Sequence, residues 1–309
     1  MTSDASRATF MPRRRLLRAG AALSTALTAP AAAAGAAAAA TPAGARRAED
    51  GLRDLEQRYA ARLGVYAHNL RTGGTVSYRA GEPFAMCSTF KAFAAAAVLR
   101  DHGDCAPLDK VIHYPPADIL SNSETTAAHL DTGMTVGDLC AAAIQRSDNT
   151  AGNLLLRRLG GPAGLTRFFR SLGDPVSRLD RWEPDLNAAV PGDPRDTTTP
   201  ERIGRDIEQL ALGQALDGAA RRQLVTWLKG TTTSGARFRA GLPQGWTVAD
   251  KTGTGDYASA HDVGVAWTTR GTPIALAVLT RKPAEDAPVD EKLIADAAAV
   301  VARILAPGE

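Results

Sequence analysis

An apolar run with one lysine at its start limits most strongly what this chain can fold into. Residues 92–99 read Ala-Phe-Ala-Ala-Ala-Ala-Val-Leu, which favours a helix, and no helix breaker occurs before Gly103. A helix that is apolar on every side is a buried one. Lys91 directly precedes the run, and an ammonium group is almost never fully buried without a partner. The sequence therefore predicts a buried helix in which the lysine has a partner.

A serine three positions before this lysine is the first candidate partner. On a helix, Ser88 and Lys91 project from the same face, and Ser88 stands near the helix N-terminus, where N–H groups favour developing negative charge. Burial would lower the pKa of the amine towards neutrality, which places a base beside a hydroxyl nucleophile. Ser-x-x-Lys also occurs often by chance, and a serine at a helix start is usually a cap. Motifs further along the chain decide between these interpretations.

Charge and cysteine content exclude several classes of function. The formal net charge of the 309 residues is +3, and residues 1–40 contain five arginines against one aspartate, which leaves −1 for the rest. A nearly neutral body offers no basic face for nucleic acid, so no nucleic-acid partner is expected. The three cysteines Cys87, Cys105 and Cys140 are an odd number, so at least one is free. No Cys-x-x-Cys occurs and the histidines are scattered, so we expect neither a metal nor another cofactor.

The N-terminal segment has the pattern of a targeting sequence. Residues 12–18, Pro-Arg-Arg-Arg-Leu-Leu-Arg, resemble a twin-arginine export signal, and a weakly apolar Ala-rich run follows to about residue 40. A membrane anchor is the alternative, but Ala, Thr and Pro give the run a low hydrophobicity for a permanent span. We therefore expect residues 1–40 to be an export leader. The product would be a soluble monomer without a stable membrane span, secreted or, in a Gram-negative host, periplasmic.

The order of strand-like and helix-like segments predicts the fold class. Strand patterns occur near both ends of the chain, at 65–70 and 75–78 and again at 246–252, 263–267 and 274–279. Helical patterns occupy most of the chain between them, so one antiparallel sheet completed by both ends is expected beside a helical insertion, with a cleft between. This is an α+β fold. Its domain would span 48–309, with an α/β lobe at about 48–85 and 231–309 and a helical lobe at about 86–230.

Two helix boundaries are predicted from local signals. The helical spacing of apolar residues from Leu52 to Leu63 predicts a first helix that Gly64 ends. Thr135 stands where a side-chain oxygen can cap a helix over 136–144.

Four motifs follow one another in the chain: Ser88-Thr89-Phe90-Lys91, Ser147-Asp148-Asn149, Glu183-Pro184-Asp185-Leu186-Asn187 and Lys251-Thr252-Gly253. With these motifs the sequence resembles the class A serine β-lactamases, in their actinobacterial-type form, from about residue 48 to the C-terminus. Each motif alone is weak evidence, whereas four in order at plausible spacing are strong evidence. The resemblance implies a β-lactamase/transpeptidase-like fold, in which an α/β sandwich lobe with a five-stranded antiparallel sheet joins an all-helical lobe.

The resemblance also implies an acyl-transfer mechanism. Ser88 would attack the strained lactam carbonyl, and the backbone N–H groups of Ser88 and Thr254 would hold the oxyanion. Either Lys91, or Glu183 acting through a water, would take the Ser88 proton, and these alternatives stay open. Ser147 would relay a proton to the departing nitrogen. Glu183 and Asn187 would order the water that releases the acyl group.

Substrate binding is implied for a second set of residues. Asn149 would offer its amide to the side-chain carbonyl of the substrate, and Lys251, Thr252, Gly253 and Thr254 would bind the substrate carboxylate. Plainer roles exist for several of these residues, since Ser147 and Asn149 could cap a helix and Lys251 could be an edge-strand charge.

An arginine that the family often places after the Lys-Thr-Gly motif is missing here, because Ala260 stands at that position. We hypothesise that Arg237 reaches the substrate carboxylate with its planar fork of donors, and that Arg239 matters little. A solvent-exposed helix-end arginine is the alternative interpretation of Arg237.

Three functions fit this fold. The first is an exported β-lactamase that hydrolyses penicillins and some cephalosporins; the alternatives are a penicillin-binding DD-peptidase and a β-lactam sensor that stays acylated. Glu183 and Asn187 favour the first, because a peptidase or sensor does not need a base for rapid deacylation. The resemblance further implies a cis Glu183-Pro184 peptide and an ion pair between Arg181 and Asp196.

Two positions depart from the family pattern. Asn122 stands where an aromatic side chain usually guards the cleft, and Gly255 stands opposite Cys87, where one branch of the family has a disulfide partner.

Overall fold

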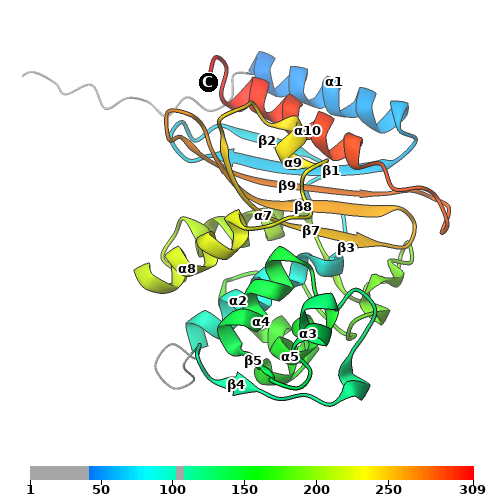
Figure 1. The fold of residues 1–309 in the computed structure, drawn as a ribbon. Coiled ribbons are helices and arrows are strands. Elements are labelled where there is room, and N and C mark those ends of the chain that lie inside the picture. Colours follow the sequence, from blue (N-terminus) through cyan, green and yellow to red (C-terminus); the bar gives the residue numbers. More distant parts are fainter. Residues whose placement is uncertain (1–41, 102–107) are drawn as a thin grey trace, which may run out of the picture. The chain divides into compact units, whose positions relative to one another are not determined.

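The computed structural model describes residues 42–101 and 108–309, which belong to one compact unit, Ala37–Glu309. Its centre is a five-stranded antiparallel sheet in the order β2-β1-β9-β8-β7 (Figure 1). The strands are β1 (Arg62–Asn69), β2 (Thr75–Tyr78), β7 (Thr247–Gly255), β8 (Ser259–Trp267) and β9 (Pro273–Arg281). Strand β1 pairs with β9, for example Val65 with Val278, so early and late segments complete one sheet. The predicted α+β fold with a five-stranded antiparallel sheet is confirmed.

Alternate residues of the strands supply two separate hydrophobic cores. Along β9, Leu276 and Val278 face a core shared with α1 (Pro42–Arg58) and α10 (Glu291–Leu305), whereas Ala277 and Leu279 face the core on the opposite side. This alternation follows from the two-residue period of a strand. Figure 1 shows α1 in blue and α10 in red above the sheet. Both faces of the sheet are therefore covered.

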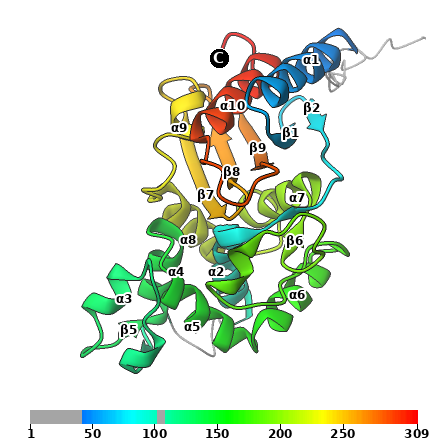
Figure 2. The ribbon, with the colours of Figure 1, turned by 90° about the vertical axis from the view of Figure 1, so that its right-hand side faces the viewer.

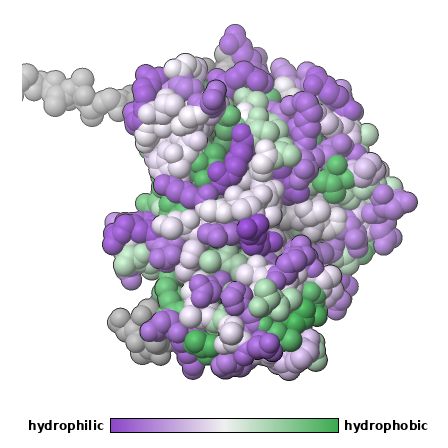
Figure 3. Space-filling view, in the orientation of Figure 1, coloured by the Kyte–Doolittle hydropathy of each residue, from purple (hydrophilic) through white to green (hydrophobic). Residues whose placement is uncertain are grey.

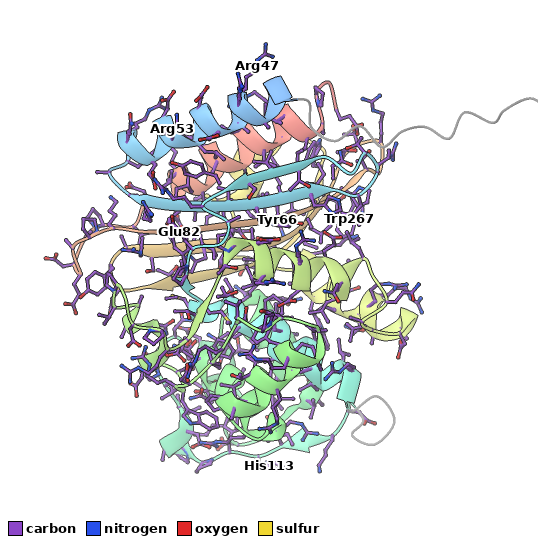
Figure 4. The ribbon with its side chains drawn as sticks, turned by 180° about the vertical axis from the view of Figure 1, so that it is seen from behind. Arg47, Arg53, Tyr66, Glu82, His113 and Trp267 are labelled. Atoms are coloured by element: carbon purple, nitrogen blue, oxygen red, sulfur yellow. The ribbon has the colours of Figure 1, made fainter. Side chains whose placement is uncertain are left out.

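Helix α7 (Pro200–Ala211) covers the second face and contacts β1, β8 and β9. The ring of Tyr66 on β1, labelled beside this helix in Figure 4, lies so close that a Cβ on Gly204 would stand 2.5 Å from its Cδ1. Helix α8 (Gly218–Lys229) contacts β7, and α9 (Phe238–Gly241) contacts α10. The boundaries of the two predicted lobes stay a prediction, and α7 contacts the sheet although it lies within 86–230.

Helix α2 (Phe90–Asp101) runs through the middle of the helical part (Figure 2). It packs against α4 (Val136–Gln145), α5 (Asn149–Leu159), α6 (Pro162–Ser171) and α8. From Ala92 to Val98 no residue of α2 is more than 1 % exposed, so the predicted buried helix is present. The remaining elements are short: α3 (Glu124–Ala128), the strand pair β3 (Phe84–Ala85) with β6 (Thr197–Thr198), and the pair β4 (Val111–Ile112) with β5 (Met134–Thr135).

One of the two predicted helix boundaries is right and the other is wrong. Thr135 caps α4, and its Oγ1 accepts a hydrogen bond from the Asp138 backbone N–H at 3.0 Å. Helix α1 ends at Arg58, before Leu63, and both Leu63 and Gly64 lie inside β1. Gly64 serves close packing there, because a Cβ would stand 2.6 Å from the Phe84 ring. The apolar residue at position 63 therefore belongs to the sheet.

Several predictions fall outside the described residues. The leader over 1–40 and Cys105 are among them. Cys87 and Cys140 are described, and both are buried free thiols. Within 42–101 and 108–309, none of the helices combines the length and the apolar character needed to cross a membrane.

Candidate active site

Ser88 lies in a 3-10 turn, Cys87–Thr89, that leads directly into α2. The turn is anchored by Thr89, whose backbone N–H and hydroxyl both donate to the Met86 carbonyl, at 3.3 and 2.6 Å. Cys87 has a φ of +46°, which is unfavourable for a residue with a side chain and persists only where the surrounding structure holds it. The turn thus presents the Ser88 hydroxyl just ahead of Lys91, in the first turn of α2.

Lys91 is fully buried and surrounded by oxygen atoms. Its Nζ lies 2.9 Å from Ser88 Oγ and 2.9 Å from Glu183 Oε1. The same Nζ also donates to the Ser147 backbone carbonyl at 2.7 Å and to Asn149 Oδ1 at 2.6 Å. Burial lowers the pKa of Lys91, and the charge of Glu183 opposes this effect. The two carbonyl oxygens can only accept, so they would occupy both N–H groups of a neutral amine and leave its lone pair for the Ser88 proton.

Glu183 is the second base beside Ser88. Its Oε1 lies 3.1 Å from Ser88 Oγ and accepts the hydroxyl proton, while its Oε2 accepts from Asn187 Nδ2 at 2.5 Å. The Ser88 hydroxyl therefore has an amine at 2.9 Å and a carboxylate at 3.1 Å. Both candidates for the acylation base are within direct reach, so the geometry keeps the two alternatives open.

The loop that carries Glu183 is held at several points. The Glu183-Pro184 peptide is cis, as the resemblance implies. Arg181 Nε donates to Asp196 Oδ2 at 2.6 Å, which confirms the implied ion pair. Asp196 Oδ1 also accepts the backbone N–H groups of Asp180 and Arg181, at 2.7 and 2.9 Å, so this carboxylate fixes the loop as well as neutralising the arginine.

Ser147 connects the lysines of the two sides of the site. Its Oγ accepts from Lys251 Nζ at 3.0 Å, so its own hydroxyl proton is available to another acceptor. Its backbone carbonyl accepts from Asn122 Nδ2 at 3.0 Å in addition to Lys91. A φ of +58° turns Ser147 towards these partners. The next residue, Asp148, serves structure, since its Oδ1 caps α5 by accepting from the Ala151 N–H at 2.9 Å.

Strand β7 forms the opposite side of the site. Burial, followed by the charges of Lys91 and Arg237, lowers the pKa of Lys251 well below its usual value. The hydroxyls of Thr252 and Thr233 lie 2.6 Å apart. Thr254 Oγ1 accepts from Arg237 Nη2 at 2.8 Å, which leaves the Thr254 hydroxyl proton free for a ligand in front of the strand.

Arg237 is held more firmly than a side chain that waits for a ligand. Its Nη1 donates to the carbonyls of Gly253 and His261, both at 2.8 Å, and its Nε donates to Glu291 Oε1 at 3.1 Å. With the bond to Thr254, four of its five N–H groups have protein partners, so it cannot present the planar fork that the sequence suggested. Arg237 can still supply charge and orient Thr254.

A cavity of about 500 Å³ lies in front of these groups. One side is lined by Ser88, Ser147, Asn149 and Asn187, and the other by Thr252, Gly253, Thr254 and Arg237. Lys91, Glu183 and Lys251 stand behind this wall, each in contact with Ser88 or Ser147. The structure thus brings together all the site residues that the sequence predicted. On the face of the molecule drawn in Figure 3, apolar residues form separate patches among hydrophilic ones.

The structure adds residues to this site that sequence reasoning missed. Asn153 on α5 hydrogen-bonds to the backbone of Glu183, and it follows Asn149 by one helical turn on the same face of the helix, a signal that was available. Arg146, Thr233 and Glu291 also line the cavity, and no motif marks them in the sequence. Asn122 does lie at the cavity, as its aligned position implied.

Gly255, at the end of β7, lies close to Cys87 and to the backbone of Asn187. A Cβ on Gly255 would stand 2.8 Å from Cys87 Sγ and 2.6 Å from the carbonyl oxygen of Asn187. The position therefore does lie opposite Cys87.

In the described part of the chain, no group of three His, Cys, Asp or Glu side chains converges as it would at a metal site. The chemistry that the site offers is that of a serine nucleophile with two adjacent bases.

Comparison with known proteins gives the family of this arrangement. A model of the beta-lactamase enzyme family matches residues 47–305. The chain belongs to the beta-lactamase enzyme family. A beta-lactamase of Streptomyces cellulosae is 50% identical over 307 residues, which cover 96% of this chain and 97% of that protein. The predicted family, and the prediction that the chain is an enzyme, are confirmed.

Two further relatives agree with this assignment. The carbapenem-hydrolyzing beta-lactamase KPC of Klebsiella oxytoca is 51% identical over 246 residues, which cover 79% of this chain and 84% of that protein. The crystal structure of a beta-lactamase from Streptosporangium roseum superposes with a TM-score of 0.82 at 50% identity, and covers 84% of this chain and 98% of that chain. The beta-lactamase fold is thus confirmed at the level of sequence and of structure.

Proposed function

We propose that this beta-lactamase hydrolyses the lactam amide of penicillins and some cephalosporins through an acyl-enzyme on Ser88. The observation that carries the proposal is the position of Ser88 Oγ, 2.9 Å from Lys91 Nζ and 3.1 Å from Glu183 Oε1, at the wall of the cavity. A hydroxyl becomes a nucleophile when an adjacent base removes its proton, and here two bases are in place.

In the first half of the reaction, Ser88 Oγ attacks the lactam carbonyl while Lys91 or Glu183 takes its proton. Backbone N–H groups of Ser88 and Thr254 hold the oxyanion. The C–N bond breaks as the Ser147 hydroxyl gives a proton to the departing nitrogen. Lys251, 3.0 Å from Ser147 Oγ, stabilises the oxygen that loses it, and the proton that the base took from Ser88 then replaces it on Ser147. The hydroxyls of Thr252 and Thr254, with the charges of Lys251 and Arg237, bind the substrate carboxylate. Asn149 binds the carbonyl of the acyl side chain.

In the second half, a water attacks the acyl-enzyme. Glu183, oriented by Asn187 through a 2.5 Å hydrogen bond, takes a proton from that water as the water oxygen bonds to the acyl carbon. The bond between this carbon and Ser88 Oγ then breaks, the proton on Glu183 passes to Ser88 Oγ, and the acid is released. This step separates a hydrolase from a penicillin-binding peptidase or a sensor, both of which keep the acyl group for longer. The contact between Glu183 and Ser88 supports the hydrolase over both alternatives.

Mass spectrometry after brief exposure to benzylpenicillin tests the proposal. The adduct should lie on Ser88, and Ser88→Ala should carry none and hydrolyse no chromogenic cephalosporin. Fragment ions must separate Ser88 from Cys87, because no lysine or arginine lies between them and both fall in one tryptic peptide. Ser77→Ala, an exposed serine on β2, is the matched control and should behave as the parent. An adduct on Cys87, or turnover by Ser88→Ala, would contradict the mechanism.

We further propose that the leader directs export of the folded enzyme through the twin-arginine route, and that the product acts as a soluble monomer outside the cytoplasm. The support is the Arg13-Arg14 pair followed by the Ala-rich run. Replacing both arginines with lysine should abolish secreted activity, whereas Arg18→Lys should not. Equal secretion of the parent, the double lysine variant and Arg18→Lys would refute the twin-arginine route. Sedimentation of the secreted enzyme would test whether it is a monomer.

A further inference from the structure

Arg146 enters the cavity from a backbone that is fixed on both sides. It is the C-terminal cap residue of α4, and its N–H donates to the Ala142 carbonyl at 3.1 Å. Before it, the Gln145 carbonyl accepts from the backbone N–H and the hydroxyl of Thr232, at 3.1 and 2.8 Å. After it, the Ser147 carbonyl is held by Lys91. The exposed Arg146 side chain therefore leaves from a defined point and lines the cavity.

The guanidinium of Arg146 has no counter-charge among the residues that the structure describes. The charged side chains that line the cavity are Arg146, Arg237 and Glu291, and Glu291 is paired with Arg237 at 3.1 Å. Within 42–101 and 108–309, the Arg146 guanidinium has neither an ion pair nor a side-chain hydrogen bond. The cavity wall therefore carries a cation without a counter-charge beside the groups proposed to bind the substrate carboxylate.

The neighbours of Arg146 define which end of the substrate it faces. Gln145 is bonded to Thr232, and the adjacent Thr233 touches Thr252, one of the proposed carboxylate-binding residues. Asn149, proposed to bind the acyl side chain, lies on the other side of Ser147 along the chain. Arg146 thus stands at the carboxylate end of the cavity. In a cephalosporin the carbon beside the carboxylate-bearing carbon is C3, so substituents on C3 project to this end.

We propose that Arg146 is a specificity residue that recognises an anionic substituent on C3 of cephalosporins. The inference rests on the proposed function, because it uses the substrate orientation that the function requires. Arginine suits a carboxylate or sulfonate, since its planar fork of donors matches two oxygens. As an exposed contact, it should act on selectivity between substrates and weaken as salt screens the charges.

A matched pair of substrates tests the proposal. Cefamandole and cefonicid have the same acyl side chain and differ at C3 only by a methyl against a sulfomethyl group on the tetrazole. In Arg146→Gln, the ratio of kcat/KM for cefonicid to that for cefamandole should fall about threefold to fivefold at low salt, the range of an exposed ion pair. Arg146→Glu should lower it further, and 1 M salt should remove most of the difference. Where turnover is slow, the ratio of the two inhibition constants against benzylpenicillin hydrolysis gives the same comparison.

Controls separate the possible failures. Arg222→Gln, an exposed arginine on α8 away from the cavity, changes the net charge equally and should leave the ratio at the parent value. An unchanged ratio in Arg146→Gln would overturn the inference. Carbenicillin differs from benzylpenicillin by a carboxylate on the acyl side chain. If Arg146→Gln lowered only the ratio of kcat/KM for carbenicillin to that for benzylpenicillin, the inference would also be overturned, because Arg146 would then recognise an anion at the acyl end of the substrate. If the parent hydrolysed none of these compounds, the proposed function itself would fall.

Discussion

The side-chain amide of Asn153 forms two hydrogen bonds with the backbone of Glu183. Its Oδ1 accepts from the Glu183 N–H and its Nδ2 donates to the Glu183 carbonyl, both at 3.0 Å. Asn153 lies within α5, whereas Glu183 lies in a loop. The position of the proposed deacylating base is therefore set by a helix of the helical part, and the loop alone does not determine it.

Replacing Asn153 with alanine should slow deacylation. Glu183 would lose both backbone contacts with α5, and misplacing a general base costs part of the roughly 10²–10⁴-fold that such a base contributes. Pre-steady-state mixing with benzylpenicillin should show the acyl-enzyme persisting at least ten times longer than in the parent. This corresponds to an increase of about 1.4 kcal/mol in the activation free energy of deacylation. Arg157→Ala, one turn further along α5, is the control. A variant with a lower melting temperature but the parent deacylation rate would reduce Asn153 to a structural role.

Glu183→Gln should accumulate the acyl-enzyme. The glutamine keeps the size of the side chain but cannot take a proton from water, so deacylation should fall by about 10²–10⁴-fold. Lys91 Nζ remains 2.9 Å from Ser88 Oγ, and we expect it to sustain acylation. Rapid-quench mass spectrometry measures both steps. If the burst of acylation disappears as well, Glu183 is also the acylation base, and Lys91 is not sufficient.

The chain offers an internal comparison between two neighbouring arginines. Arg237→Ala should lower kcat/KM for penicillin, by an amount that corresponds to about 1.5–3 kcal/mol of lost transition-state stabilisation. The substitution removes a charge from the carboxylate site and releases the Thr254 hydroxyl. Thr254→Val should cause much of the same loss in kcat/KM. The loss in the double variant should therefore be smaller than the sum of the losses in the two single variants, expressed as free energies. Fully additive losses would show that Arg237 acts without Thr254.

Arg239 contacts a buried carboxylate away from the cavity, so we expect it to matter for stability and, as hypothesised, little for hydrolysis. Its Nη2 lies 3.0 Å from Oδ1 of Asp250, which is fully buried, and its Nε donates to Ser234 Oγ at 2.8 Å. Arg239→Ala would leave a buried carboxylate without its cation, and we expect a lower melting temperature. Its KM for penicillin should remain close to that of the parent. A stable Arg239→Ala protein with an altered KM would contradict this division of roles.

Residue types and spacing alone could predict only those parts of the site that are close together in the chain, whereas the distant Glu183 and Lys251 were predicted from the motifs shared with a known family. Ser88 with Lys91, and Ser147 with Asn149, are short local patterns, and helix or turn geometry brings such residues together. Thr233 and Glu291 could not be found, because their proximity to Thr252 and Arg237 depends on how separate segments pack. Residues that meet only through tertiary packing, and that belong to no motif, could therefore not be predicted from the sequence.

The fold was predictable for a similar reason, and its errors are local. Alternation of side chains marks the strands, but periodicity alone joined Leu63 to the helix before it, although the chain turns at Ala60, with a φ of +46°, and enters β1. Strand β8 begins at Ser259, earlier than the expected 263, because its first residues include the polar but fully buried His261 and Asp262. Because the sheet is covered on both faces, β8 buries polar residues as well as apolar ones, and the polarity pattern does not mark where the strand begins.

The buried Asp206 should make the protein less stable as the pH rises, the opposite of what a paired surface carboxylate does. It is buried in α7 beside Asp174, and burial first, then the neighbouring carboxylate, raises its pKa from 3.8 to about 9. Oδ2 of each carboxyl group has no other partner among the described residues, so a hydrogen bond between them requires a shared proton. The folded protein thus keeps a proton that the unfolded chain releases above pH 3.8. The stability from this group is complete below that pH and is lost as the pH rises towards about 9.

Asp206→Asn should remove this dependence, because the amide can donate to Asp174 Oδ2 at every pH. Between pH 5 and pH 8 the free energy of unfolding of the parent should fall relative to the variant by about 1–4 kcal/mol, since each pKa unit is worth about 1.36 kcal/mol. Urea titrations at several pH values measure the difference. Asp217→Asn is the control of opposite sign: Asp217 accepts N–H groups of α8, which lower its pKa, so its contribution is lost on acidification. A pH-independent difference between the parent and Asp206→Asn would mean that Asp206 is ionised in the folded protein.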